Sequence, residues 1–124
     1  MKNIPIKQSL LIVILTCCLF SCKKETIVQT NNAPSKVTNF TITYGSDDVY
    51  KWTDATDADG DAVTYDLYLL KDTNAKPFKV AENLATSQYT ASVSYFGVTR
   101  AMIVVAKDGK GAETTSIEYP TIIL

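Results

Sequence analysis

Four aspartates lie close together in the middle of the chain and could bind a metal ion. The four carboxylates fall within eight residues and belong to Asp54, Asp57, Asp59 and Asp61. A calcium ion needs six to eight oxygen ligands, and a glycine such as Gly60 lets a ligating loop fold around the ion. We therefore treat these aspartates as a candidate calcium site. The alternative is a polar turn in which the carboxylates accept hydrogen bonds from backbone N–H groups.

Paired acids also carry out glycoside hydrolysis, but this cluster does not fit that chemistry. Such enzymes place two acids across a cleft and raise the pKa of one of them. The aspartates instead crowd a single predicted turn of a small domain. The chain has no histidine, which excludes a conventional catalytic triad and histidine-ligated zinc. We predict that the protein is not an enzyme.

The cysteine and charge counts narrow the function classes further. All three cysteines, Cys17, Cys18 and Cys22, lie in the first 22 residues, so the rest of the chain has no disulfide and no thiol nucleophile. The net charge is −1, from 12 basic and 13 acidic residues. Because nucleic-acid phosphates need a basic surface, nucleic acid is not expected as a partner.

The elements that position these residues read as strands. Alternating apolar residues and turn signals recur along the chain, and no stretch has a convincing helical period. Seven strands are predicted, over residues 37–44, 49–53, 62–70, 78–80, 88–93, 100–107 and 113–124, the last bent or interrupted at Pro120. The four aspartates then form the turn between the second and third strands. The predicted class is an all-β, antiparallel, seven-stranded sandwich.

The order of certain residues resembles a fibronectin type III domain. The resemblance rests on Pro34 before the first strand, Trp52 on the second, Tyr65 on the third, and Val104-Val105-Ala106 followed by Lys107-Asp108-Gly109. The D-x-D-G-D-x-x-T-Y turn at residues 57–65 is similar to fibronectin-III-like domains of bacterial surface lipoproteins. The resemblance covers residues 34–120 and implies an immunoglobulin-like sandwich. It also implies that Asp108 lies at the same end of the sandwich as the aspartate cluster.

An apolar patch is predicted on the outer side of the third and sixth strands. Since side chains alternate between the two faces of a strand, Tyr68, Leu70, Ile103 and Val105 point outward if their neighbours form the core. A contiguous exposed patch favours a docking surface for a surface protein. A covering segment is one alternative, and a register shifted by one residue is another.

Aromatic residues suggest glycan binding as a second function. Tyr95 and Phe96 are predicted in a loop, and either Tyr68 or Tyr50 near them could complete a platform that stacks on sugar rings. The alternative is that these rings pack in the core or at a corner of the sandwich.

Residues 1–21 have the layout of a secretory signal peptide. Lys2 and Lys7 precede an apolar run over residues 10–20, which is shorter than the ~20 residues that span a bilayer. The run ends in Leu-Phe-Ser-Cys, which resembles a bacterial lipobox and implies that Cys22 is lipidated. The Ser-Cys-Lys-Lys pattern is similar to lipoproteins of the Bacteroidetes group. Since no aspartate follows Cys22, the resemblance implies the outer membrane, and the side that the protein faces stays open.

These observations predict three parts and a function class. Residues 1–21 form the signal peptide, residues 22–35 the lipidated cysteine and a flexible tether, and residues 36–124 the folded domain. We expect a lipid-anchored outer-membrane lipoprotein whose domain is a non-catalytic interaction or spacer module. The alternative is a glycan-binding accessory of a polysaccharide-uptake system, stabilised by calcium.

Overall fold

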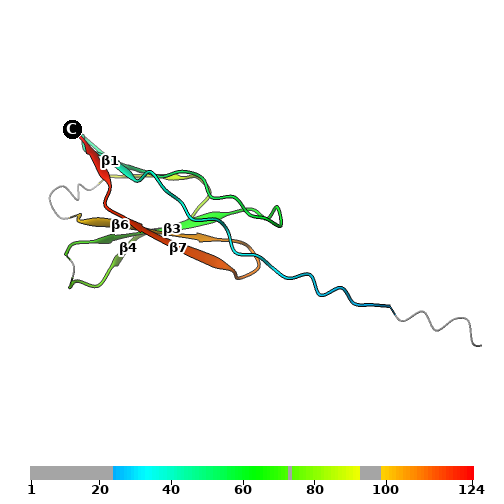
Figure 1. The fold of residues 1–124 in the computed structure, drawn as a ribbon. Helices are drawn as coiled ribbons and strands as arrows, with labels where there is room; N and C mark the ends of the chain where they lie inside the picture. Colours follow the sequence, from blue (N-terminus) through cyan, green and yellow to red (C-terminus); the bar gives the residue numbers. More distant parts are fainter. Residues whose placement is uncertain (1–23, 73, 93–98) are drawn as a thin grey trace, which may run out of the picture.

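The chain folds into two packed β-sheets, as a computed structural model shows (Figure 1). The structure describes residues 24–72, 74–92 and 99–124, and no helix occurs within these ranges. The strands are β1 (Thr41–Thr43), β2 (Asp48–Lys51), β3 (Thr64–Leu70), β4 (Phe78–Leu84), β5 (Gln88–Ala91), β6 (Ala101–Lys107), β7 (Glu113–Glu118) and β8 (Thr121–Ile123).

One sheet has the order β5-β2-β1-β8 and the other β4-β3-β6-β7. Every pair of neighbours is antiparallel except β1 and β8, which are parallel. Two mostly antiparallel sheets packed face to face form an immunoglobulin-like sandwich. The predicted all-β sandwich fold is therefore confirmed.

The described residues form eight strands where seven were predicted, because the last one is divided at Pro120. Proline has no N–H to give to a ladder and often ends pairing. After Pro120 the chain crosses to the other sheet, where the Thr121 N–H donates to the Phe40 carbonyl at 2.8 Å and the Tyr44 N–H donates to the Ile123 carbonyl at 3.1 Å. The predicted interruption is confirmed, but its two halves belong to different sheets.

Two other strands differ most in length from the prediction. The first is only three residues long because Asn39, with φ of 56°, takes a left-handed conformation that breaks an extended run. Strand β4 continues to Leu84, through the predicted turn at residues 83–85, because β3 keeps pairing with it across a bulge.

The core lies between the sheets and contains the faces that alternation predicted. Tyr65, Leu67 and Leu69 of β3 are buried, as are the inward residues of β6, which are Met102, Val104 and Ala106. Trp52 packs edge-on against Tyr65, with ring centroids 5.6 Å apart. Burying each large apolar side chain stabilises the fold by roughly 1.5–3 kcal/mol, so this layer supplies much of the driving force.

The described chain enters at one end of the sandwich and finishes at the other. In Figure 1 the N-terminal segment, in blue and cyan, leaves the molecule at the end that carries the β2–β3 and β6–β7 loops. Strand β8, in red, ends at the opposite end beside β1. The aspartate cluster therefore lies at the end where the chain arrives.

Candidate functional site

The aspartates of the β2–β3 loop hold the loop's own backbone. The Asp57 side chain accepts hydrogen bonds through Oδ1 from the N–H groups of Asp59, at 2.8 Å, and Asp61, at 3.4 Å. Gly60 has φ of 77°, and its N–H donates to the Asp57 carbonyl at 3.2 Å. Glycine takes this left-handed conformation without steric cost. These contacts are the ones expected if the aspartates form a polar turn.

Three of the four predicted metal ligands come together. Asp57, Asp59 and Asp61 each offer an oxygen atom within 4.8 Å of the others, whereas Asp54 is exposed and is not part of this group. Three carboxylates supply only part of the six to eight oxygens that calcium needs. Asp57 Oδ2 is buried and has no hydrogen-bond partner among the described residues, so one ligand atom is unused by the fold.

A lysine of the chain already neutralises part of this cluster. Lys110 lies in the β6–β7 loop, and its Nζ forms an ion pair with Asp61 Oδ2 at 2.9 Å. The contact with Asp61 raises the pKa of Lys110, and Asp59 and Asp108 add to that effect. A cation that took Asp61 as a ligand would have to displace this ammonium group.

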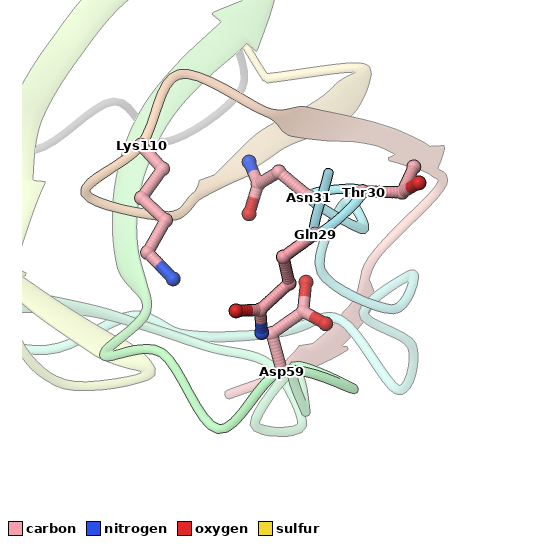
Figure 2. Close-up of a pocket in the computed structure, with 5 residues that line it drawn as sticks. All are labelled: Gln29, Thr30, Asn31, Asp59 and Lys110. Carbon is pink, nitrogen blue, oxygen red and sulfur yellow. The ribbon is translucent and has the colours of Figure 1, made fainter. Parts of the chain in front are cut away.

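Two asparagines from the N-terminal segment join the β2–β3 and β6–β7 loops. Asn31 Nδ2 donates to Asp108 Oδ2 at 2.8 Å, and Asn32 donates to Asp59 through its backbone N–H at 2.6 Å and through Nδ2 at 2.9 Å. The predicted approach of Asp108 to the cluster is thus observed, with Asn31 and Asn32 between the two loops. Figure 2 shows Asn31, Asp59 and Lys110 around an open pocket of about 240 Å³, which Gln29 and Thr30 also line.

These hydrogen bonds favour the ionised aspartates. The backbone and side-chain bonds from Asn32 lower the pKa of Asp59. Burial acts to raise the pKa of Asp108, but bonds from Asn31 and from the N–H groups of Ala112 and Lys110 outweigh it and lower that pKa. A general acid needs a raised pKa, so neither group suits that role.

Further bonds continue this attachment along the chain. Ser35 exchanges hydrogen bonds with Thr56, where the Ser35 N–H donates to the Thr56 carbonyl and the Thr56 N–H donates to Ser35 Oγ. Thr114 Oγ1 donates to the Pro34 carbonyl at 2.6 Å, and the Val37 N–H donates to Ser116 Oγ at 3.1 Å. We call residues 31–37 the strap. The predicted tether is therefore held against the domain over its last residues, although the sequence there has no repeating pattern that predicts such contacts.

The predicted apolar patch lies on the face of the β4-β3-β6-β7 sheet that points away from the core, which we call the outer face. The register places Tyr68 opposite Ile103, and Leu70 opposite Ala101. Tyr68, Leu70 and Val105 are half-buried, while Ile103 is only 8% exposed. The four residues share a face as predicted, but Ile103 is covered by its neighbours.

One apolar residue outside the predicted set, Ile117, enlarges this patch, and an exposed tyrosine follows just beyond the strand. Ile117 pairs with Ile103 across β6 and β7 and is 62% exposed, and Tyr119 just beyond β7 is 72% exposed. The alternation of Thr115, Ile117 and Tyr119 in the sequence was the available signal. The outer face therefore offers apolar surface as far as the β7 edge of the sheet.

A buried aspartate borders the patch and fixes the neighbouring strand. Asp66 is 5% exposed and accepts bonds from Lys107 at 2.6 Å, from Lys79 at 3.3 Å and from the Asn83 N–H at 2.9 Å. Burial acts to raise the pKa of Asp66, but these bonds outweigh it and lower that pKa. Lys79 also lies over the Tyr68 ring, 5.4 Å from its centroid.

Of the two tyrosines expected to complete the aromatic platform, Tyr50 lies in the core and Tyr68 lies on the outer face. Tyr50 is fully buried and packs near Tyr89, with centroids 6.4 Å apart, so it cannot stack on a sugar. The Lys79 ammonium lies over the Tyr68 ring. Tyr95 and Phe96 lie outside the described residues, as do the predicted signal peptide and Cys22. Within the described ranges, no helix is long and apolar enough to span a membrane.

Comparison with known proteins gives one similar fold. No family model and no curated protein matches the chain. A solved structure described as an Fn3-like protein from Clostridium thermocellum is similar, with a TM-score of 0.48 and 19% sequence identity over 75% of this chain and 100% of that chain.

Proposed function

We propose that the protein is a lipid-anchored bacterial outer-membrane lipoprotein whose β-sandwich is a non-catalytic interaction or spacer module. The observation that carries the proposal is the position of the strap at one end of the sandwich. The chain that follows Cys22 meets the domain there, and the outer face lies on a different side of the described domain. The Bacteroidetes-type lipobox of the sequence supplies the anchor.

The strap limits how far the domain can move from a lipidated Cys22. Asn31 and Asn32 are bonded to the two loops, so at most eight residues, 23–30, separate a lipidated Cys22 from the first attached residue. Eight extended residues reach roughly 28 Å, so the loop end would stay near the lipid headgroups. A short tether and a fixed end suit a module that presents its other surfaces outward.

The pKa directions support a non-catalytic role. The shifts that are resolved for Asp59, Asp66 and Asp108 are all downward, and their causes are hydrogen bonds and ion pairs within the fold. An acid catalyst at neutral pH needs the opposite shift, produced by burial or a neighbouring carboxylate.

Cell fractionation tests the anchor. Replacement of Cys22 by Ser should move the protein from the outer-membrane fraction to the soluble fraction, and metabolic labelling with a fatty acid should be lost. A matched Ser21→Ala variant keeps a small residue before the cysteine and should remain anchored. Continued labelling of Cys22→Ser would reject the anchor.

The outer face is the proposed docking surface for a surface protein. Tyr68 and Val105 can be replaced by polar residues without adding charge beside Lys79 and Lys107, so Tyr68→Ser with Val105→Thr is the suitable variant. It should remain folded and should lose cross-linking to neighbouring surface proteins. Unchanged cross-linking of the folded variant would reject this surface.

The second candidate is a glycan-binding accessory of a polysaccharide-uptake system, stabilised by calcium at Asp57, Asp59 and Asp61. The pocket in Figure 2 favours it, because the amides of Gln29 and Asn31 lie beside charged groups that can bond to sugar hydroxyls. A glycan array run with calcium and with a chelator separates the two candidates. Absence of signal in both conditions would reject the second.

A further inference from the structure

The four edge strands differ in their protection against pairing with another strand. The edges are β4 and β7 in one sheet and β5 and β8 in the other. Proteins protect edges by making them short or by placing charges on them. Strand β5 has four residues and β8 has three, and β4 carries the ion pair between Lys79 and Glu82. Strand β7 has six residues, and its two glutamates stand at its ends.

The register of β7 shows which of its backbone groups are free. The Asp108 N–H donates to the Ala112 carbonyl at 3.1 Å. Hydrogen-bonded pairs alternate along an antiparallel ladder, so Ser116 bonds to Val104, and the N–H and C=O groups of Thr115 and Ile117 point away from β6. Across residues 24–72, 74–92 and 99–124, these groups have no hydrogen-bond partner.

A groove runs beside these free groups. It has a volume of about 350 Å³ and lies between β7 and the strap. The residues that line it are Lys36, Val37, Thr38, Thr115, Ser116, Ile117 and Glu118. Apart from Lys36 and Glu118, which carry opposite charges, the residues that line the groove are uncharged. A segment with an uncharged centre therefore fits the groove.

The outer face continues across this edge. Lys79, Tyr68, Ile103 and Ile117 stand in register on β4, β3, β6 and β7. A fifth strand paired with β7 would place one of its side chains beside Ile117, whose side chain is largely exposed. An apolar residue at that position would extend the patch, because cross-strand apolar pairs stabilise sheets.

We propose that the β7 edge binds an extended segment of another protein by β-strand addition. The backbone groups of Thr115 and Ile117 pair with the segment, and the exposed side chain of Ile117 selects an apolar residue beside it. This inference rests on the proposed interaction module and names the class of its partner. The partner presents a short extended stretch in which uncharged polar and apolar residues alternate.

Amide exchange measured by NMR on the full chain tests the pairing directly. The probe is an acetylated and amidated peptide of alternating Thr and Val with a Lys at each end. At a probe concentration ten times its Kd, exchange of the Thr115 and Ile117 amides should slow about elevenfold, since protection follows 1 + [L]/Kd. Protection of amides on β4, β5 or β8 in place of these two would overturn the proposal.

The Ile117→Pro variant removes the free N–H without removing a bond of the β6–β7 ladder. It should fold, with the Val104 and Ser116 amides still protected, and bind the probe at least tenfold more weakly. Ile117→Thr keeps the N–H and should lose less affinity. Equal binding by a folded Ile117→Pro would overturn the proposal.

Protection of Thr115 and Ile117 by self-association without the probe would also overturn it, since the occupant would be a second copy. A loss of anchoring in Cys22→Ser is measured separately, so either idea can fail alone.

Discussion

The strap end of the sandwich and its outer face make opposite use of their surface groups. At the strap end, acidic side chains of two loops are taken up by Asn31, Asn32 and Lys110 of the same chain. On the outer face and the β7 edge, Ile117 and two backbone amides have no such partner in the described structure. Charged residues at the strap end are therefore paired within the fold. The outer face and the β7 edge keep apolar surface and backbone groups of the kind that a partner binds.

The largest effect should come from placing a charge inside the outer face. Ile103→Lys buries an uncompensated charge and should lower the free energy of unfolding by about 3–5 kcal/mol. Its paired neighbour provides the control, because Ile117→Lys at an exposed site should change stability by less than about 0.5 kcal/mol. Urea unfolding of both variants tests the difference. Similar losses of unfolding free energy in the two variants would show that Ile103 and Ile117 do not differ in burial.

A smaller effect should follow from releasing the strap. The double change Asn31→Ala with Asn32→Ala removes the side-chain bonds to Asp108 and Asp59 and should lower the urea midpoint of unfolding by less than Ile103→Lys does. It should also expose residues 31–35 to proteolysis. Asn74→Ala is a matched control, because Asn74 is exposed and, among the residues that the structure describes, forms a hydrogen bond only through its backbone N–H. Equal proteolysis of the two variants would argue against the strap.

The stability of the domain should also respond to acid, through Asp59 and Asp108 at the strap end and Asp66 beside the outer face. The pKa values of Asp59, Asp66 and Asp108 are all lowered on folding. Carboxyls of this kind contribute stability above their unfolded pKa of about 3.9, and the contribution is lost as pH falls through the lower folded values. The free energy of unfolding should therefore be constant near neutral pH and decrease below about pH 4. Asp66→Asn should flatten this decrease, and a profile unchanged by it would assign the effect elsewhere.

Under the main proposal, calcium should have the smallest effect of all on the stability of the domain. Lys110 already pairs with Asp61, so millimolar calcium should leave the melting temperature close to its value in chelator. For the glycan-binding candidate, calcium should raise the melting temperature, and Lys110→Ala should enlarge the rise because the competing ammonium is gone. Differential scanning calorimetry of the unmodified protein and of Lys110→Ala, with calcium and with chelator, distinguishes these outcomes.

Local pattern predicted the fold better than it predicted the site. Alternation in β3 and β6 correctly assigned inward and outward faces, because the period of a strand is two residues. It could not show that Ile103 is buried, since burial depends on the neighbouring strands, which place Tyr68 and Ile117 beside it. Four aspartates in one loop suggested four ligands, but the folded loop leaves Asp54 outside the group.

By itself, the sequence determined the all-β class, the interruption at Pro120 and the side chains that fill the core. These features depend on residues that are close together along the chain. Only the tertiary structure decided that Asn31 meets Asp108 across 77 residues and that the last strand divides between two sheets. It also decided that Thr115 and Ile117 of β7 line a groove together with residues 36–38. Such contacts require the sandwich to close first, because they join loops and edges that no local spacing relates.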